Sequence, residues 1–228
     1  MSSANVLVRK PYRGAAMEGR VARWYAQQTM GLARRFQSEA REIAQNLAPG
    51  ARVLEVAPGP GYLAVQIAKL GVVDVSGLDV SRTFVEIANE HAARSGARVA
   101  FRQGDAAAMP FGPDAFDFII CRAAFKNFSD PAGAIAEMHR TLRPGGRAII
   151  RDMRGDASDA ALDDEVRGMR LGLIATLLNR VIFRRLRRRA YLGETLARMA
   201  EASPFGGAEV RQSPIGFDVV LAKPGAGE

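Results

Sequence analysis

Three acidic residues stand at or just beyond the ends of short apolar runs, where parallel strands would present a ligand-binding edge. Glu55 lies within the first run, Asp79 follows the second, and Asp105 follows the third. Carboxylates in such positions accept hydrogen bonds from hydroxyl groups and attract cationic groups. Asp79 in particular stands where an acid would bind a ribose. These residue types favour a hydroxyl-bearing ligand rather than a metal ion, because the single cysteine and two histidines form no cluster spaced like a metal site.

A loop rich in glycine and proline follows the first run, with the sequence Ala57-Pro58-Gly59-Pro60-Gly61. Small residues let a ligand approach the backbone closely, and the helix that follows offers free N–H groups at its start. The pattern Gly59-x-Gly61-x-x-Ala64 also fits a dinucleotide fingerprint. The loop and Asp79 by themselves therefore leave a nicotinamide-dependent oxidoreductase open.

The elements that would position these residues follow an α/β rhythm. Short apolar runs alternate with amphipathic stretches between residues 52 and 152, which is typical of βαβ units and a mostly parallel, doubly wound sheet. Parallel strands are predicted at residues 52–56, 73–78, 98–103, 116–121 and 147–152, and a C-terminal antiparallel hairpin at 208–222. Helices are predicted at 15–48 ahead of the sheet and over 153–203 as a cap. At 228 residues, a single domain over 1–228 is expected.

Four blocks, in this order and spacing, resemble the class I methyltransferases that use S-adenosylmethionine, in particular the group of ubiquinone and menaquinone biosynthesis methyltransferases. The blocks are the loop from Glu55 to Gly61, the segment 77–81, the turn 104–111, and the stretch from Phe116 to Arg147. Together they cover about residues 52–152. The resemblance implies a Rossmann-like sheet of seven strands, five parallel and two in the terminal hairpin.

The resemblance also implies roles for individual residues. Glu55 would lie by the amino-acid part of S-adenosylmethionine, Asp79 would bind the ribose hydroxyls, and Asp105 with Ala106 would read the adenine. Further cofactor contacts are implied for Tyr25, Ala57, Pro58, Gly59, Gly61, Val80, Cys121 and Arg122. Ala57 stands where the family usually has its first glycine, and a methyl group there is tolerable only if φ is negative.

The acceptor side has candidates but no assigned catalytic residue. Methyl transfer is an in-line displacement that depends mainly on orientation, so a dedicated base is optional. Lys126 and Asn127 replace the histidine pair of the quinone-type relatives, which argues against a quinone-like acceptor, and a surface loop pair is an equally good interpretation of them. Arg151 and Asp152, at the end of the fifth strand, are the other substrate-binding candidates.

The basic charge is concentrated in one segment. The formal net charge is +8, and eight arginines lie between Val166 and Gly193 with no acidic residue among them. A basic amphipathic helix is predicted there. Its simplest interpretation is a cap helix with a solvated basic face. The alternative is a contact of Arg180–Arg189 with an anionic membrane or an acidic substrate, while nucleic acid is disfavoured because few aromatic residues are interleaved with the arginines.

The sequence predicts methyl transfer from S-adenosylmethionine to a small or amphiphilic molecule at O, N, S or C. The competing enzyme is an NAD(P)-dependent oxidoreductase, and the competing non-enzyme is a cofactor-binding protein that acts through its basic helix. The sequence contains neither the apolar core of a signal peptide nor an apolar stretch of about 18 residues, so a cytoplasmic location is expected.

Overall fold

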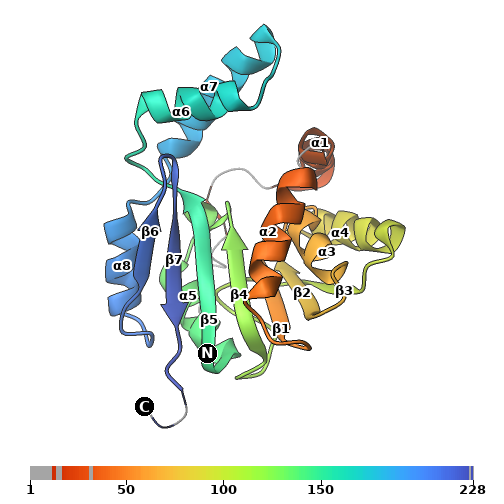
Figure 1. Cartoon of the computed structure of the whole chain (residues 1–228), viewed down its shortest axis with the longest axis vertical. Coiled ribbons are helices and arrows are strands. Elements are labelled where there is room, and N and C mark those ends of the chain that lie inside the picture. Colours follow the sequence, from red (N-terminus) through yellow and green to blue (C-terminus); the bar gives the residue numbers. More distant parts are fainter. Residues whose placement is uncertain (1–11, 14–16, 31–32, 226, 228) are drawn as a thin grey trace, which may run out of the picture.

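A computed structural model of the chain describes residues 12–13, 17–30, 33–225 and 227. Its centre is one seven-stranded sheet in the order β3-β2-β1-β4-β5-β7-β6 (Figure 1). The strands are β1 Arg52–Val56, β2 Asp74–Asp79, β3 Val99–Gln103, β4 Phe116–Arg122, β5 Leu142–Met153, β6 Glu209–Gln212 and β7 Gly216–Ala222. The first five are parallel, and β7 runs antiparallel between β5 and β6. The predicted Rossmann-like sheet with its terminal hairpin is confirmed.

One predicted strand boundary was wrong by several residues. The strand expected to begin at Arg147 begins at Leu142, which pairs with Phe116 across an irregularity in the β4–β5 register. The other strand boundaries differ from prediction by at most one residue.

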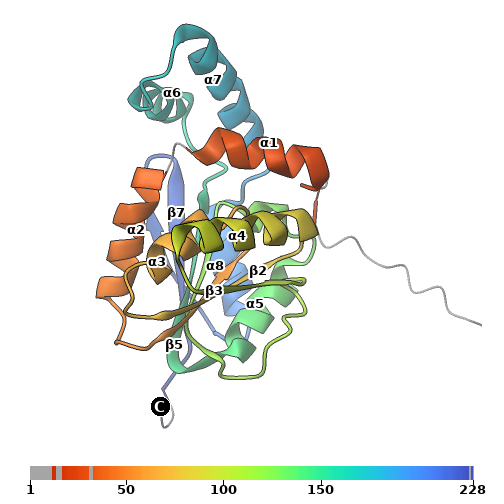
Figure 2. The same ribbon diagram turned by 90° about the vertical axis from the view of Figure 1, so that its right-hand side faces the viewer.

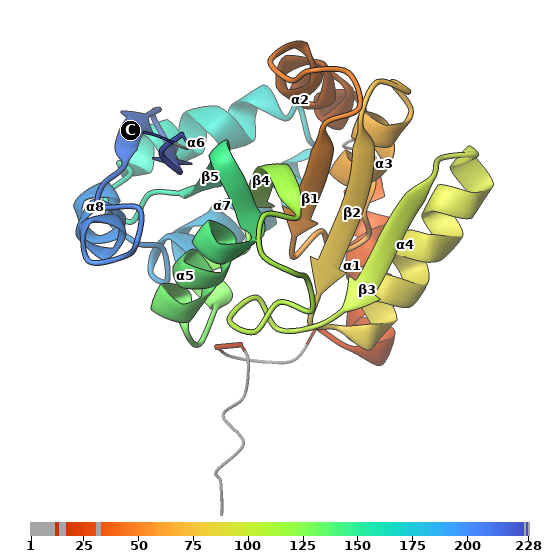
Figure 3. The same cartoon turned by 90° about the horizontal axis from the view of Figure 1, so that it is seen from below.

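Helices cover both faces of the sheet (Figure 3). One face carries α2 Ala33–Gln45, α3 Tyr62–Ala68 and α4 Arg82–Ser95, and the other carries α5 Pro131–Thr141 and α8 Gly193–Glu201. Residues of β1 alternate between two buried clusters, with Val53 in the α3 cluster and Leu54 in the α5 cluster. This double burial explains why the central strands read as continuous apolar runs.

Local signals begin and end these helices. Ser81 precedes α4, and its hydroxyl accepts a hydrogen bond from the backbone N–H of Phe84. Gly96 ends the same helix in the left-handed conformation, with φ of 65°. Asp130 caps α5 by accepting from the N–H of Gly133. These caps fix the start of α4 directly beside the end of β2.

Three helices lie beyond or across the carboxyl ends of the strands. Helix α1 Gly19–Thr29 lies across that edge, while α6 Asp159–Gly168 and α7 Leu173–Arg187 form a hairpin that projects away from the sheet (Figures 1 and 2). The helices predicted over 15–48 correspond to α1 and α2, although residues 15–16 and 31–32 lie outside the described part. The predicted cap was too broad, because α8 packs against β6 and β7 instead. None of the described helices is long and apolar enough to cross a membrane.

Candidate functional site

The loop after β1 has a backbone shape that brings its N–H groups toward β2. The N–H of Ala57 donates to the carbonyl of Leu78 at 2.7 Å, and the N–H of Gly59 donates to Oδ2 of Asp79 at 2.9 Å. Gly61 has φ of 74°, and a Cβ there would lie 2.7 Å from the ring of Phe101. Only glycine fits that position without a shift of the ring.

Ala57 does not have the negative φ that a methyl group at this position requires. Its φ is +56°, in the left-handed region that a methyl group disfavours. The hydrogen bond to Leu78 and the turn that follows hold it there. The loop therefore keeps the conformation of a glycine-containing loop and stores strain at Ala57.

Asp79 ends β2 and contacts the loop after β1. Its side chain is buried, Oδ2 accepts from Gly59 and Oδ1 accepts from the N–H of Ser81 at 2.9 Å. Burial raises the pKa of Asp79 to about 6, although the two backbone hydrogen bonds favour its charged form. The carboxylate thus joins the loop to the start of α4 and keeps lone pairs for a ligand.

Glu55 reaches from β1 beneath the same loop. Its Oε2 accepts a hydrogen bond from the N–H of Ala64 in the first turn of α3, at 2.8 Å. Burial raises the pKa of Glu55 to about 8, opposed by that hydrogen bond and by the charge of Arg122. A cationic group bound nearby would favour its ionised form.

The turn after β3 lies next to Asp79 along the sheet edge. The N–H of Gly104 donates to the backbone carbonyl of Asp79 at 2.9 Å. Asp105 shapes the turn, because its Oδ1 accepts from the N–H of Ala107 at 2.9 Å. Ala106 is half-buried at the tip of this turn. The three predicted acidic residues therefore gather at neighbouring strand ends.

The remaining predicted cofactor residues surround this edge from three elements. Tyr25 of α1 is 40% exposed, and its ring meets that of Phe84 edge-on, with centroids 5.9 Å apart. Pro58 is buried in the loop, and the carbonyl of Val80 accepts from the side chain of Gln103. Helix α1 thus places Tyr25 beside the start of α4.

Cys121 and Arg122 end β4 with different environments. Cys121 is fully buried, and burial raises the pKa of its thiol well above the usual value, so it remains an uncharged core side chain. Arg122 turns toward α2, where Nε donates to Oε2 of Glu39 at 2.8 Å and the guanidinium lies over the ring of Phe36. Cys121 therefore presents no exposed surface to a ligand in this arrangement.

The four acceptor-side candidates do not form one cluster. Lys126, in the 3₁₀ turn η2 Phe125–Asn127, is buried, and its Nζ donates to Oδ1 of Asp152 at 2.7 Å and to the carbonyl of Ala123 at 2.6 Å. Asn127 is half-buried, and its carbonyl accepts from the N–H of Arg13. Arg151 lies on the opposite face of β5.

Arg151 belongs to an ion-pair network under α2. It contacts Asp218 at 2.7 Å, Glu39 at 3.0 Å and Glu42 at 3.3 Å. Adjacent residues of a strand point to opposite faces, so Arg151 and Asp152 could not both face one pocket. The expectation that both would contact the acceptor overlooked this alternation.

Two glutamates that were not predicted from the sequence position the elements around the site. Glu18 accepts from the backbone N–H groups of Arg82 and Thr83, which fastens the start of α1 to the start of α4. Glu39 pairs with both Arg122 and Arg151, so α2 is tied to β4 and β5. The sequence does show an acidic residue directly before a helix at Glu18. It does not show that the partners of Glu18 are Arg82 and Thr83.

Three arginines of α7 form ion pairs that the sequence did not predict. Arg180 and Arg184 pair with Asp163 of α6 at 3.3 and 3.4 Å, and Arg187 pairs with Asp159 at 2.8 Å. The acidic side of α6 therefore neutralises one side of α7.

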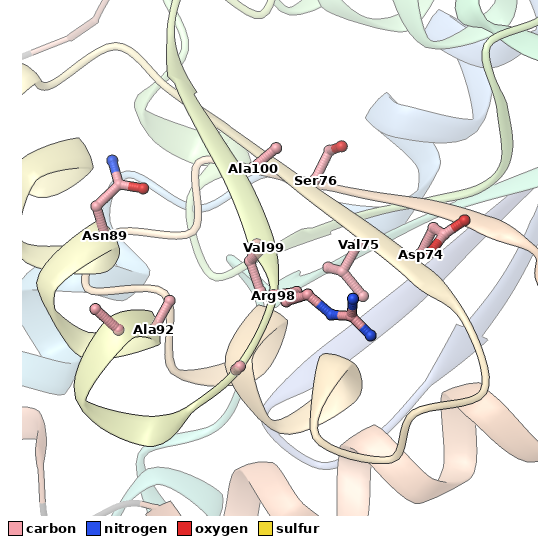
Figure 4. A pocket seen from close by; sticks show the side chains of 10 residues that line it. Asp74, Val75, Ser76, Asn89, Ala92, Arg98, Val99 and Ala100 are labelled. Carbon is pink, nitrogen blue, oxygen red and sulfur yellow. The ribbon is translucent and has the colours of Figure 1, made fainter.

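A surface depression lies away from all of these residues (Figure 4). It is lined by the first residues of β2 and β3 and by the last turns of α4, including Asp74, Asn89 and Arg98. Those strand residues are at the amino ends, so the depression opens on the edge of the sheet opposite Asp79. None of the predicted cofactor residues lines it.

Comparison with known proteins agrees with the geometry at the strand ends. A family model described as a methyltransferase domain matches residues 54–150. The chain is 35% identical over 117 residues to a demethylmenaquinone methyltransferase of Thermus thermophilus, which covers 51% of this chain and 53% of that protein. It is 32% identical over 120 residues to an O-methyltransferase of Penicillium expansum, which covers 51% of this chain and 44% of that protein. The chain spans about half the length of the curated relatives it matches.

A solved structure shows the same fold over nearly the whole chain. It is described as an S-adenosylmethionine-dependent methyltransferase from Methanococcus maripaludis, and it matches with a TM-score of 0.72 and 20% identity over 94% of this chain and 97% of that one. At that identity the likeness shows the fold alone.

The residues present fit S-adenosylmethionine as the cofactor of this domain. Its ammonium and sulfonium suit the buried carboxylates of Glu55 and Asp79, and its ribose hydroxyls suit Asp79 at the end of β2. At Gly59, where φ is 55°, the space that a Cβ would take is open, which permits the close backbone approach that the ligand needs. Residues 54–150 match a methyltransferase domain, and the site residues within them resemble those of class I S-adenosylmethionine-dependent methyltransferases.

Proposed function

We propose that this protein transfers the methyl group of S-adenosylmethionine to a small or amphiphilic acceptor. The observation that carries the proposal is the carboxylate of Asp79, which is buried at the carboxyl end of β2 and holds the glycine loop to the start of α4 through two hydrogen bonds of 2.9 Å. A buried acid in that place supports recognition of a ribose.

The acidic residues at the strand ends also disfavour the competing function, that of an NAD(P)-dependent oxidoreductase. A nicotinamide dinucleotide would bring its pyrophosphate against the glycine loop, beside the buried side chains of Glu55 and Asp79. Neither side chain supplies a positive charge for the phosphates. An NAD(P)-dependent oxidoreductase is therefore not favoured.

When bound, S-adenosylmethionine would supply an electrophilic methyl group, with its sulfur as the leaving atom that keeps the electron pair. The protein's own residues bind and orient. Glu55 and Asp79 hold the donor at the strand ends, and Tyr25 borders it from α1. Alignment of donor and acceptor within about 3 to 3.5 Å supplies much of the rate enhancement, so no general base is assigned.

One feature of the structure supports an apolar or amphiphilic acceptor, whereas the relatives leave the methylated atom open. The exposed apolar side chains of Val21 and Trp24 lie on α1 at the same edge of the sheet as Asp79. The relatives act, by their names, on demethylmenaquinone in one case and at oxygen in another, with similar identity to this chain. The cofactor half therefore does not select the methylated atom.

Calorimetric binding tests the cofactor part of the proposal. We expect S-adenosylmethionine and S-adenosylhomocysteine to bind, NADH not to bind, and Asp79→Asn to weaken both adenosyl ligands at least tenfold. The matched control is Asp74→Asn, which changes an exposed aspartate at the other end of the same strand. Binding of NADH in place of the adenosyl ligands would overturn the proposal.

Release of S-adenosylhomocysteine tests the transfer itself. The protein is incubated with S-adenosylmethionine and pools of quinols, phenols, amines and thiols. We expect turnover with at least one pool and loss of that turnover in Asp79→Asn. Tight cofactor binding without turnover on any pool would favour a non-catalytic cofactor-binding protein.

A further inference from the structure

Helix α7 carries an apolar stripe that no other described element covers. Its side chains are 86% exposed at Leu173, 85% at Ile174, and more than half exposed at Leu177, Leu178 and Val181. These positions follow the i, i+4, i+8 spacing of a single helix face. The helix has no buried residue at all. The stripe is at the part of the molecule that projects farthest from the sheet (Figures 1 and 2).

Two arginines continue the same face toward the end of the helix. Arg185 and Arg188 follow Val181 by four and seven residues, so they lie on the same helix face as the apolar stripe, toward the C-terminal end of the helix. Both arginines are exposed. Arg180, Arg184 and Arg187 lie on another side, where Asp159 and Asp163 pair with them. The face thus changes from apolar to cationic along its length.

The exposed arginines of this face need a negatively charged partner, which α7 of a second copy of the chain does not supply. Residues 167–192 contain no acidic side chain. A parallel copy would bring arginine against arginine, and an antiparallel copy would bring arginine against leucine and isoleucine. An anionic lipid surface meets both parts of the face, because acyl chains accept the apolar stripe and phosphate headgroups accept the arginines.

We propose that α7 attaches this protein to the surface of an anionic lipid bilayer. Leu173, Ile174 and Leu177 enter the boundary between headgroups and acyl chains, and Arg185 and Arg188 bind lipid phosphates. The ion pairs with α6 hold the hairpin rigid, so the stripe is exposed before contact. This inference does not depend on methyl transfer.

Vesicle co-sedimentation tests the apolar part. The full chain is mixed with vesicles of phosphatidylcholine alone or of equal parts phosphatidylcholine and phosphatidylglycerol, and binding to the mixed vesicles is expected. The double variant Ile174→Asn/Leu177→Asn should lose about tenfold or more of that binding. Its matched control, Leu70→Asn/Val72→Asn, removes two exposed apolar side chains from the α3–β2 connection and should bind normally. Equal losses in both variants would overturn the proposal.

A charge-matched pair tests the arginines. Arg185→Gln/Arg188→Gln should weaken binding by about fivefold for each arginine, and added salt should reduce this difference. Arg82→Gln/Arg94→Gln removes the same charge from exposed positions on α4 and should have little effect. Equal binding to neutral vesicles and mixed vesicles would contradict the headgroup contacts.

A fluorescent probe tests the depth of insertion. Trp24 is the single tryptophan, so Trp24→Phe removes the native signal and Ile174→Trp introduces one on the stripe. Its emission should shift to shorter wavelength on mixed vesicles, whereas Val72→Trp in the same background should not shift. Absence of the first shift would overturn the proposal. Sedimentation that shows a dimer dissolved by Ile174→Asn/Leu177→Asn, without vesicle binding, would assign the stripe to a second copy instead.

Discussion

Nζ of Lys126 lies 2.7 Å from Oδ1 of Asp152, and these side chains are only 5% and 3% exposed. The pair joins the turn after β4 to the end of β5. Oδ1 of Asp152 also accepts from the N–H of Met153, and Oδ2 accepts from the N–H of Lys126. The two groups therefore satisfy each other and the local backbone, which makes them a structural connection between two strands.

Removing one partner of this pair should be costly. Lys126→Met leaves the Asp152 carboxylate buried without its cation, and we expect the free energy of unfolding to fall by about 3 to 5 kcal/mol. The double variant Lys126→Met/Asp152→Leu should recover much of that loss, because no uncompensated charge remains. Urea denaturation measures both. A single variant as stable as the wild type would show that the pair does not connect the strands.

Ala57→Gly should stabilise the protein without changing the cofactor loop. Ala57 has φ of +56°, which glycine adopts without steric cost, so we expect a gain of about 1 kcal/mol in the free energy of unfolding. Ala93→Gly, on the exposed side of α4, is the matched control and should lose about 1 kcal/mol. Thermal and urea unfolding measure whether each variant gains or loses free energy of unfolding. A loss at both positions would mean that Ala57 is not strained.

Cofactor binding should release protons near neutral pH. Burial raises the pKa of Glu55 from about 4.5 to about 8, so its folded form holds a proton that the unfolded form has lost. Between these two pH values the unfolded state binds fewer protons, and the stability of the ligand-free protein should therefore fall as pH rises. A cationic ligand favours the carboxylate, so affinity for S-adenosylmethionine should rise over the same range.

Calorimetry in buffers of different ionisation enthalpy measures that proton release. Glu55→Gln should reduce it and flatten the rise in affinity up to about pH 8, leaving a smaller contribution from Asp79, whose pKa burial raises to about 6. Affinity that stays constant from about pH 6 to about pH 8 in the wild type would contradict the assignment of Glu55 to the cationic part of the ligand.

Glu39→Gln should loosen α2 from the sheet. Glu39 is buried and pairs with Arg122 and Arg151, so its neutralisation leaves both guanidinium groups without their shared carboxylate and should cost about 1 to 3 kcal/mol. Glu42→Gln is the control, because Glu42 is 63% exposed and makes a single contact of 3.3 Å with Arg151. Its effect should stay below about 1 kcal/mol. Hydrogen exchange of α2 amides should rise in the first variant and not in the second.

The cofactor side of the fold was predictable because it depends on local patterns. Apolar runs gave the parallel strands, and acidic residues at their ends marked the edge where Glu55, Asp79 and Asp105 gather. The start of β5 was missed, since the pairing of Leu142 with Phe116 is a contact between distant segments. The left-handed conformation of Ala57 was also hidden, because a residue type does not reveal a strained φ.

The acceptor side was harder because it depends on which way side chains point. The alternation of side chains along a strand is sufficient, from the sequence alone, to place Arg151 and Asp152 on opposite faces. The burial of Lys126 could not be predicted, since it requires the turn after β4 to fold under the carboxylate of Asp152. On α7, the spacing of Arg180, Arg184 and Arg187 matches Asp159 and Asp163 across the hairpin, but only the structure shows that α6 and α7 pack together.

The position of β7 between β5 and β6 sets an order of assembly during synthesis. Strands β1, β2, β3 and β4 have all been synthesised by residue 122, so every strand that neighbours β1 and β2, the strands of Glu55 and Asp79, is then present. Strand β5 obtains its antiparallel neighbour only after residues 216–222 have been made. A nascent chain therefore completes its cofactor cradle first and closes its acceptor side last.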